Sequence, residues 1–571
     1  MVIESKRRIM KKIIYGNSNF RKIKINNDYF YVDKTHFIET LENLNEDFVI
    51  FLRPRRFGKS LFLSTLQYYY DEKSQDEFEA MFHDTYIGQH STPLKNSFRI
   101  LFFEFSGINV DSSIDKIYER FTFKTRIAIR SYLQNYAYEE KYIHKLEEIH
   151  NPTSLMEYFF EITKNDKIYL LIDEYDQFAN AILAYNMNDF LEIVGKGGFV
   201  RSFYEVLKTA TFSGTVQKMF ITGVTPITLD SLSSGFNIVS NISHKQAFNA
   251  LAGFTQEEVA YVLENSIFQK CKEIDQDVLL EKIKTWYNGY LFSSEAEKRI
   301  YNATLVNYFI SNFNYEKCRL PKKMLDANVA SDYKAIMKLF NIGDADKNYD
   351  ILKSLIEENS VTGMIKDRYD LNKVFSRDDF ITLIYSMGFI TIKEELFSEE
   401  LQFQIPNYVI KMLYFNYFAL ELQNRNNLKM STDIKSILRA LALGDTEPFS
   451  NQLNEVIKTL SNRDHYGFDE KHFHSIVLSL LSFAEFYFID SQPEKNNKYP
   501  DILLLGRDEK VPNNYLFELK WLKSKDNYKS IKKEGINQVK GYLKLDSIQA
   551  TPKLRAFLLI GSKDGVEFVE D

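Results

Sequence analysis

A lysine and a serine follow a glycine at the point where an apolar run of this sequence gives way to a helical pattern. The run Phe48–Leu52 is followed by Arg53-Pro-Arg-Arg-Phe-Gly-Lys-Ser60, and the helical pattern continues to Tyr70. Backbone N–H groups at such a helix start bind phosphates, a lysine there reaches the β- and γ-phosphates, and a serine hydroxyl holds Mg²⁺. The segment therefore predicts a nucleotide-binding loop, whose cofactor-binding residues are Arg56, Phe57, Gly58, Lys59, Ser60 and Leu61. Arg53 stands where the usual loop has its first glycine.

Two carboxylates follow the buried apolar run Ile168–Ile172. Asp173 would bind the nucleotide's Mg²⁺ together with Ser60, and Glu174 would orient or deprotonate the attacking water. The alternative makes both acids an ordinary helix cap. Thr222, at the end of a third apolar run, is either a hydroxyl near the γ-phosphate or a strand-end threonine without a ligand.

The arginines of the loop leave two interpretations open. Arg53, Arg55 and Arg56 either assist at the phosphates or contact a neighbouring subunit, or they form a solvated loop.

A second charged group lies near the C-terminus, where Asp501 begins one apolar run and Glu518 and Lys520 end another. Side chains alternate along a strand, so Glu518 and Lys520 share a face, and Asp501 joins them if the two strands pair. Two carboxylates about 5 Å apart repel by roughly 3 kcal/mol at an effective dielectric near 20, so the pair needs a cation or a shared proton. Mg²⁺ suits this site, with Lys520 orienting the water that attacks a phosphodiester. The alternative is a capped turn beside an exposed charged face.

Further polar residues surround this second group. A helix is predicted over His472–Phe488, and Glu470, just before it, falls close to one face with Glu485 at helical spacing. Glu470 or Glu485 is therefore a candidate third metal ligand, and Glu470 is preferred. His474 is interpreted as a partly buried core residue. Seven lysines between Lys520 and Lys540 form either a solvated helix face or a surface for a phosphate backbone.

The residues of both candidate sites must be positioned by strands and helices, which the apolar pattern of the sequence predicts. Four apolar runs, Phe48–Leu52, Ile100–Phe103, Ile168–Ile172 and Met219–Thr222, predict buried parallel strands with helical crossovers, hence a sheet covered on both faces. Residues 255–450 show long helical patterns with few strand candidates. The tail shows strand patterns over Asp501–Leu505, Tyr515–Leu519 and Leu554–Ile560. We predict an α/β protein with three domains, at residues 1–290, 291–464 and 465–571.

Composition limits the classes of function. The chain has 571 residues, 44% hydrophobic and 26% charged, with a net charge of −6, which excludes wholesale disorder and a histone-like coating protein. Its 2 cysteines cannot build a disulfide framework or a four-cysteine zinc site, and they favour a reducing compartment. Apolar stretches are too short for a signal-peptide core or a membrane span. We expect a cytoplasmic protein that does not enter a membrane.

Several ordered motifs make the first half resemble the bacterial AAA-ATPase-like family. They are Phe30–Thr35, Arg53–Ser60, Leu171–Asp176, Gly223–Ile227 with Ser234–Asn237, and Trp286–Tyr290. The resemblance covers roughly residues 15–310. It implies a P-loop ATPase fold of the ASCE (AAA) type, with Lys59, Ser60, Asp173 and Glu174 in the roles above. Relatives' arginine-bearing loop is similar to this one.

The tail resembles the PD-(D/E)XK nuclease superfamily, through Asp469–His474, Tyr499–Asp501, Phe517–Lys520, and Gln538 with Tyr542. The resemblance implies that Glu470, Asp501 and Glu518 are metal-site acids, Lys520 the catalytic lysine and Gln538 a supporting polar residue. Where relatives often have a glycine-rich stretch, this chain has Glu494–Tyr499.

The combined prediction is an enzyme with two linked activities. It binds and hydrolyses ATP with Mg²⁺, and a metal-dependent nuclease-like domain acts on nucleic acid, with DNA as the expected substrate; homo-oligomers fit this class. The alternative is a nucleotide-switched binding or signalling protein whose nuclease-like domain binds without cleaving.

Overall fold

The computed structural model of the 571-residue chain describes residues 11–26, 28–107, 113–177, 182, 192–195, 197–226, 238–325, 340, 342–366, 375–426, 433–459, 468–484, 486–491, 500–507, 510–524 and 527–571. The chain forms two compact units. The first comprises residues 1–348 and 362–409, and the second comprises residues 349–361 and 410–571. The three predicted domain ranges stay a prediction.

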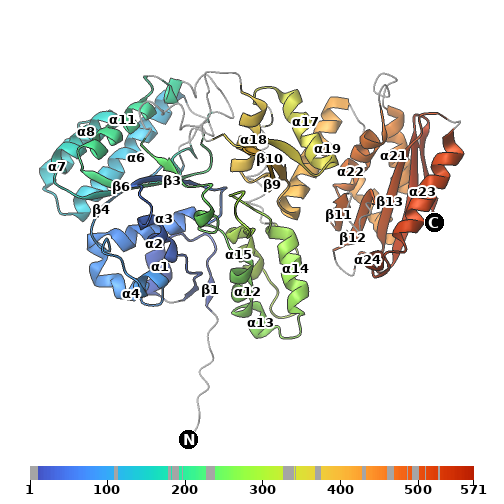
Figure 1. Ribbon diagram of the computed structural model, residues 1–571, viewed down its shortest axis with the longest axis horizontal. Helices are drawn as coiled ribbons and strands as arrows, with labels where there is room; N and C mark the ends of the chain where they lie inside the picture. Colours follow the sequence, from blue (N-terminus) through green and yellow to red (C-terminus); the bar gives the residue numbers. More distant parts are fainter. Residues whose placement is uncertain are drawn as a thin grey trace, which may run out of the picture. The chain divides into compact units, whose positions relative to one another are not determined.

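The first unit is built on a five-stranded sheet in the order β4-β5-β6-β3-β7, and every neighbouring pair is parallel (Figure 1). Its strands are β3 (Phe48–Leu52), β4 (Arg99–Glu104), β5 (Ile168–Asp173), β6 (Val216–Gly223) and β7 (Ser240–Asn241). All six residues of β5 are buried, as expected for a continuous apolar run in a parallel sheet. The four predicted strands are confirmed. One strand, β6, separates β3 from β5, which is the strand order of an ASCE fold.

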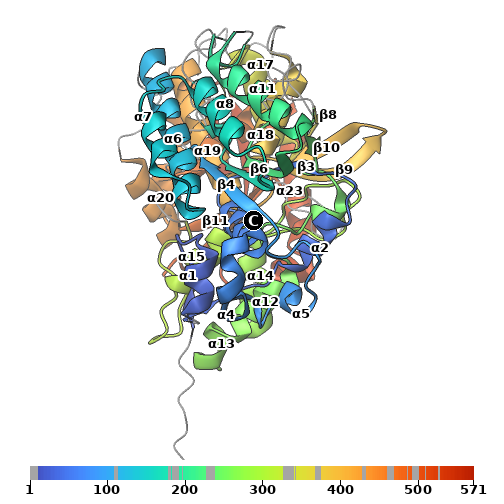
Figure 2. The same cartoon turned by 90° about the vertical axis from the view of Figure 1, so that its left-hand side faces the viewer.

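Helices cover both faces of this sheet, as predicted. Helix α3 (Lys59–Tyr70) packs against β4, β5 and β6 on one face, together with α1 (Phe20–Ile25) and α4 (Phe78–Phe82). Helices α6 (Ile114–Asn135), α8 (Pro152–Ile162) and α11 (Phe199–Phe212) pack on the other face (Figure 1, Figure 2). The remaining elements of residues 11–241 are β1 (Lys12–Ile13), β2 (Tyr29–Phe30), α2 (His36–Glu42), η1 (Glu72–Glu77), α5 (Tyr86–Gln89) and α7 (Glu140–Glu147).

The rest of the first unit is mostly helical, as predicted, but it also contains a small sheet. The helical elements are η2 (Gln246–Phe248), α12 (Gln256–Glu264), α13 (Ile267–Lys270), α14 (Gln276–Tyr287), α15 (Ala303–Ser311) and α18 (Arg377–Ser386). The helical pattern that begins at Gln256 is divided between two helices, α12 and α13. Strands β8 (Val361–Met364), β9 (Thr391–Phe397) and β10 (Glu400–Gln404) form a sheet in the order β8-β10-β9 that the sequence analysis missed.

The second unit contains a mixed sheet in the order β11-β12-β13-β14-β15, with β13 parallel to β14 and the other pairs antiparallel. The strands are β11 (Tyr487–Ser491), β12 (Ile502–Gly506), β13 (Asn514–Trp521), β14 (Leu554–Ser562) and β15 (Gly565–Glu570). The helices are α17 (Ala345–Glu357), α19 (Tyr408–Asn426), α20 (Ile434–Leu443), α21 (Glu447–Thr459), α22 (Glu470–Leu481), α23 (Tyr528–Tyr542) and α24 (Asp546–Gln549). The first residues of α17 and α19 belong to the first unit.

The predicted helix over His472–Phe488 is too long at its C-terminal end. Helix α22 ends at Leu481, and Tyr487 already belongs to β11. The apolar run through Ala484 joins two buried elements, and periodicity alone does not separate a buried helix from a buried strand.

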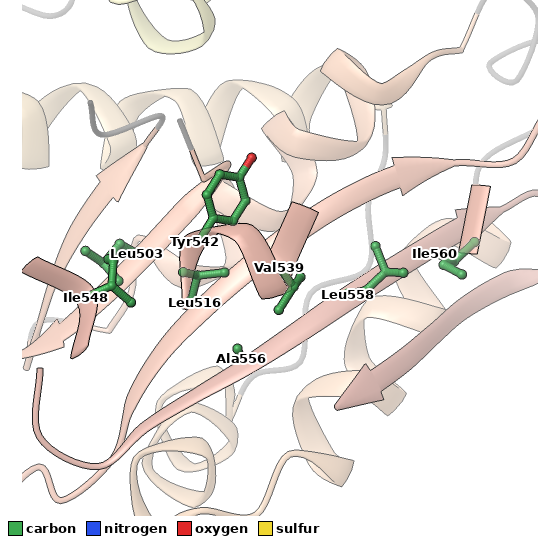
Figure 3. Packing of buried hydrophobic residues seen from close by; sticks show 8 residues of the cluster. All are labelled: Leu503, Leu516, Val539, Tyr542, Ile548, Ala556, Leu558 and Ile560. Carbon is green, nitrogen blue, oxygen red and sulfur yellow. The ribbon is translucent and has the colours of Figure 1, made fainter. Parts of the chain in front are cut away.

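Helix α23 packs on the mixed sheet through a compact apolar cluster. Val539 and Tyr542 of α23 contact the aliphatic side chains of β12, β13 and β14 (Figure 3). The strand residues are Leu503, Leu516, Ala556, Leu558 and Ile560, and Ile548 of α24 completes the cluster. Gly535 allows the close approach, because a Cβ at this position would lie 2.4 Å from Leu558 Cδ1.

Cys271 and Cys318 form a disulfide, with a Cα–Cα distance of 5.6 Å across 47 residues of sequence. The sequence analysis did not anticipate this pairing, and disulfides are rare in the reducing compartment that it expected. The cytoplasmic location therefore stays a prediction. Among the described residues, no helix has both the length and the apolar character needed to cross a bilayer.

Candidate functional site

The loop between β3 and α3 brings backbone groups and Lys59 to the start of a twelve-residue helix. Gly58 has φ 104° and Arg56 has φ 68°, so the chain passes twice through the left-handed region in this loop. Glycine adopts that conformation without penalty, whereas a residue with a Cβ is strained. The N–H groups of the first turn of α3 therefore lie at the end of the loop, where a helix attracts anions.

Lys59 is buried at the first position of α3. Its Nζ donates to the carbonyl oxygens of Arg53 at 2.9 Å and Pro54 at 3.1 Å. Burial lowers the pKa of Lys59, and the negative charges of Asp173 and Glu174 oppose this effect. The lysine thus lies within electrostatic reach of the acids that follow β5, as the sequence analysis required.

The two acids at the end of β5, Asp173 and Glu174, differ in their surroundings. Asp173 is buried, and its Oδ1 accepts a hydrogen bond of 2.5 Å from Thr222 Oγ1 on the neighbouring strand β6. Glu174 is half-buried and has φ 54°. Burial and the charge of Asp173 raise the pKa of Glu174, while Lys59 and Arg55 oppose the rise. A carboxylate whose pKa is raised accepts a proton more readily, which suits a general base.

A cavity of about 570 Å³ opens beside this loop. A volume of a few hundred cubic ångströms is typical of sites for small molecules. Of the predicted nucleotide-site residues, the cavity is lined by Arg56, Phe57, Gly58, Lys59, Ser60, Leu61 and Glu174. Asp173 and Thr222 are not part of its lining; they form a buried, hydrogen-bonded pair.

Both interpretations offered for Arg53 are wrong. Its side chain is 1% exposed and donates to the carbonyl oxygens of Leu52, Ser243 and Phe248. The guanidinium carbon lies 4.4 Å from the ring centroid of Phe51 and 4.1 Å from that of Phe292. Burial lowers the pKa of Arg53 to about 9. This arginine fixes the loop to the protein interior and is exposed neither to phosphate nor to solvent.

The sequence analysis missed Thr304 as a support of the loop. Its backbone N–H and its Oγ1 both donate to the carbonyl oxygen of Arg56, at 3.3 and 2.7 Å. Gly253 N donates to Phe57 O at 2.7 Å. Asn307 of α15 donates to Ile14 O at 2.8 Å, so the N-terminal segment is tied to the same helix. These contacts join positions some 200 to 300 residues apart and leave no local signal in the sequence.

The second candidate site lies where β12 and β13 pair. Ile502 lies opposite Phe517 in this antiparallel pair, so Asp501 and Glu518 come next to each other at the same end. Asp501 Oδ2 accepts a hydrogen bond of 2.7 Å from Leu519 N. Asp501 and Glu518 thus converge as the sequence analysis expected.

Burial makes this carboxylate pair costly to ionise. Glu518 is 2% exposed, and burial together with the charge of Asp501 raises the pKa of Glu518 to about 8. Burial also raises the pKa of Asp501. Within the described part of the chain, Glu518 Oε2 is buried and receives no hydrogen bond. A buried oxygen without a donor, next to a second carboxylate, fits a divalent cation, and Mg²⁺ is commonly held by one or two carboxylates.

Lys520 lies between two of the predicted metal ligands. Its Nζ is 3.1 Å from Glu518 Oε1 and 3.4 Å from Glu470 Oε1. Burial opposes the charge on Lys520, but Glu518 and Glu470 outweigh burial and raise the pKa of this lysine. Burial raises the pKa of Glu470. No group of three or more His, Cys, Asp or Glu side chains is arranged to hold one metal ion in the described ranges. Asp501 and Glu518 fit a metal, and Glu470 faces the lysine.

The remaining predicted residues surround this pair. Gln538 of α23 has a buried Oε1 that, in the part of the chain the structure describes, receives no hydrogen bond. Burial and the charges of Glu518 and Asp501 raise the pKa of Tyr542, whose ring belongs to the cluster of Figure 3. His474 is buried, as expected, with Nε2 3.2 Å from Asp501 O, and burial lowers its pKa to about 4. Glu485 lies outside the described residues.

The lysine-rich stretch contains both paired and unpaired lysines among the described residues. Lys532 pairs with Glu567 at 2.8 Å, and Lys540 pairs with Asp571 at 3.4 Å. Lys523, Lys529 and Lys533 are exposed. The exposed lysines can contact an anionic surface without first breaking an ion pair among the described residues.

Comparisons with known proteins match the two parts of the chain that contain these candidate sites. Residues 14–233 match the family model described as "Predicted AAA-ATPase", and residues 468–563 match that of the PD-(D/E)XK nuclease superfamily. A curated protein of Azotobacter chroococcum mcd 1, "Uncharacterized protein in vnfD 5'region", is 28% identical over 301 residues. The matched segment is 51% of this chain and 50% of that protein, so the chain spans about half the length of this relative. The chain therefore combines an AAA-ATPase-like domain with a PD-(D/E)XK nuclease superfamily domain.

Proposed function

From an AAA-ATPase-like domain joined to a PD-(D/E)XK nuclease superfamily domain in one chain, we propose that this protein binds and hydrolyses ATP and cleaves DNA with the help of Mg²⁺. The observation that carries the ATPase half is the cavity of about 570 Å³ lined by Gly58, Lys59, Ser60 and Glu174. The Asp501–Glu518 pair beside Lys520 supports the nuclease half.

In the ATPase half, the residues of the loop bind the phosphates. The first-turn N–H groups of α3 and the Lys59 ammonium would contact the phosphate oxygens, and the ammonium would exchange its two carbonyl partners for them. Glu174 would accept the proton of the attacking water. Ser60 and Asp173 would hold Mg²⁺, which neutralises charge on the phosphates when it is bound. Thr222, through its hydrogen bond, would position Asp173.

In the nuclease half, Asp501 and Glu518 would hold the cation, which supplies Lewis-acid stabilisation of a phosphodiester when it is bound. Lys520 would orient the attacking water once the carboxylate charges are shared with the ion. Glu470 would hold the lysine in place or act as a third ligand. The exposed lysines Lys523, Lys529 and Lys533 would contact the DNA backbone, so binding weakens with salt.

The ATPase half is tested by phosphate release and by titration with a fluorescent ATP analogue. Lys59→Ala should abolish nucleotide binding, whereas Glu174→Gln should bind normally and turn over roughly 100-fold more slowly, because general-base catalysis contributes at least that factor. Lys298→Ala is the matched control, since Lys298 is an exposed lysine paired with Glu257. Normal turnover by Lys59→Ala would contradict the assignment.

One observation favours the second candidate function, a nucleotide-switched protein that binds nucleic acid or a protein partner without cleaving it. Lys520 is engaged by both Glu518 and Glu470, and the described residues include no ready three-ligand metal group. A protein that turns over ATP and binds DNA, but leaves the DNA intact with Mg²⁺ or Mn²⁺, would establish this alternative.

A further inference from the structure

The three arginines of the loop between β3 and α3 have different surroundings. Arg53 is buried and donates to three carbonyl oxygens. Arg56 lines the cavity beside Lys59, and Thr304 holds its backbone carbonyl. Arg55 is half-buried and lines the same cavity as Lys59 and Glu174. Its Nη2 donates to Gln177 Oε1 at 2.6 Å. The side chain of Arg55 is thus directed to the turn that follows β5.

This turn also carries Glu174. Gln177 N donates to the carbonyl oxygen of Glu174 at 3.1 Å, so the partner of Arg55 and the candidate base belong to one turn. The positive charge of Arg55 opposes the rise in the pKa of Glu174 and adds to the lowering of the pKa of Lys59. A guanidinium, an ammonium and a carboxylate therefore surround the same part of the cavity.

The hydrogen-bond partner of Arg55 is a neutral side chain. Gln177 offers a neutral amide oxygen, and in the described ranges Arg55 forms no ion pair. Other arginines of this chain pair with carboxylates, for example Arg21 with Glu77 and Arg555 with Glu570. Guanidinium has five N–H donors, so the bond to Gln177 leaves donors for a phosphate. An amide holds the side chain in place without neutralising it.

We propose that Arg55 is a catalytic residue supplied by the same chain, whose guanidinium contacts the terminal phosphate of bound ATP and stabilises the charge of the transition state. The proposal rests on ATP hydrolysis as the proposed function. The water oxygen forms a bond to the γ-phosphorus while the bond from this phosphorus to the β,γ-bridging oxygen breaks. ADP leaves with that electron pair, and one water proton passes to Glu174. Arg55 forms and breaks no covalent bond, and Gln177 is its positioning residue.

An arginine that stabilises the phosphoryl oxygens typically contributes a factor of 10³ to 10⁵ to turnover. Arg55→Ala should therefore lower kcat by roughly 1000-fold. Affinity for the fluorescent ATP analogue should stay within about 3-fold, because the interaction strengthens in the transition state and contributes little to ground-state binding. Arg55→Lys should recover only part of kcat, since an ammonium lacks the planar fork. Arg21→Ala is the control, because Arg21 is an exposed arginine that does not line the cavity.

Gln177→Leu tests the positioning role, because leucine keeps the size of the side chain and removes the acceptor. It should lower kcat by roughly 10-fold with unchanged nucleotide affinity, and the loss should vanish in an Arg55→Ala background. An equal loss in both backgrounds would contradict a role through Arg55.

A mixing experiment separates supply within one chain from supply by a neighbour. Arg55→Ala retains a nucleotide site, and Lys59→Ala retains Arg55. If Arg55 acts within its own chain, the mixture stays inactive. Recovery of turnover on mixing would show that a neighbour supplies the arginine and would overturn the proposal.

The outcomes for the proposed function and for this inference are distinct. If the wild-type protein hydrolyses ATP and Arg55→Ala keeps the wild-type kcat, the role of Arg55 is wrong and ATP hydrolysis stands. If the wild-type protein neither binds nor hydrolyses ATP, the proposed function is wrong and the role of Arg55 falls with it. Retained binding of the ATP analogue by Arg55→Ala shows that the variant is folded.

Discussion

Each compact unit has a lysine beside acidic side chains, Lys59, which is buried, and Lys520, which is half-buried, and their pKa values are shifted in opposite directions. The hydrogen bonds of Lys59 go to two carbonyl oxygens, and burial lowers its pKa. Lys520 is also penalised by burial, but Glu518 at 3.1 Å and Glu470 at 3.4 Å raise its pKa. Lys59 therefore loses only two hydrogen bonds to neutral carbonyl oxygens when it binds a phosphate. Lys520 can leave Glu518 and Glu470 only when a cation neutralises these carboxylates.

The Glu518 carboxyl predicts a pH dependence of stability. Its pKa is about 8 in the folded chain and roughly 4.3 in an unfolded one, so the folded state prefers the protonated form. The stability from this group is present below the unfolded pKa and is lost as the pH rises through about 8. Between pH 5 and pH 8, Glu518→Gln should become progressively more stable than the wild type, with the difference growing by roughly 3 to 4 kcal/mol, at about 1.4 kcal/mol per pH unit.

The measurement is urea unfolding without divalent cations, followed by Trp521 fluorescence in a Trp286→Phe background. The chain has 2 tryptophans, so this background leaves one reporter in the second unit. Mn²⁺ should remove the difference at pH 8, since a bound cation favours the ionised pair. Parallel pH profiles of the two proteins would contradict a raised pKa at Glu518.

Residue identity and spacing predicted some of these positions and not others. Alternation along a strand places Glu518 and Lys520 on one face, and the loop pattern identifies Lys59. The environment of Arg53 could not be predicted, because its acceptors lie up to 195 residues away. For the same reason, the spacing of the three arginines in this loop gave no sign that Arg53 is buried while Arg55 and Arg56 line the cavity.

Among the elements, the strands that carry the candidate sites were predictable. Continuous apolar runs are typical of strands buried on both faces. One such run, Ile168–Ile172, leads directly to Asp173, the last residue of β5. The hairpin of β9 and β10 was not predictable in the same way. Residues 393–399 of β9 and its turn are exposed and largely charged, so they show no apolar alternation. These residues form a strand because they pair with β10.

The hydrogen bond from Thr304 of α15 to the loop between β3 and α3 can be tested by mutation. Thr304→Val keeps the size of the side chain but removes the hydroxyl that donates to Arg56 O. One lost hydrogen bond of this kind contributes about 1 kcal/mol, so affinity for the ATP analogue should fall roughly 5-fold. Thr304→Ser retains the donor and should bind as the wild type does. Equal affinities of the valine and serine variants would show that the contact does not shape the loop.

The close packing of α23 on β14 in the second unit can be tested at Gly535. A methyl group at Gly535 would meet Leu558 Cδ1 at 2.4 Å, Cδ2 at 2.8 Å and Cγ at 3.1 Å. Overpacking of this kind costs roughly 1 to 3 kcal/mol, and alanine returns about 1 kcal/mol through helix propensity. Gly535→Ala should therefore lower the free energy of unfolding by about 1 kcal/mol.

The matched control is Asn537→Ala, which replaces an exposed residue of the same helix and should be neutral or slightly stabilising. Both variants are followed by Trp521 fluorescence in urea. A gain in stability for Gly535→Ala would show that Leu558 yields and that α23 is not tightly fixed to the sheet.

At the scale of the whole molecule, the chain links an AAA-ATPase-like domain to a nuclease superfamily domain while its net charge is −6. A net acidic protein binds DNA only where cations gather, and the exposed lysines near α23 provide such a place. If these lysines contact DNA, binding should depend strongly on salt and little on sequence. The acidic remainder of the chain disfavours binding elsewhere.

The most direct measurement is cleavage of plasmid and linear DNA by the purified full chain with Mg²⁺ or Mn²⁺, with and without ATP. The account predicts cleavage that disappears in Asp501→Ala and in Lys520→Ala, persists in the exposed-residue control Asp546→Asn, and changes in rate when ATP is added to the wild type but not to Lys59→Ala. Intact DNA under all these conditions, or cleavage that survives in Asp501→Ala, would contradict it.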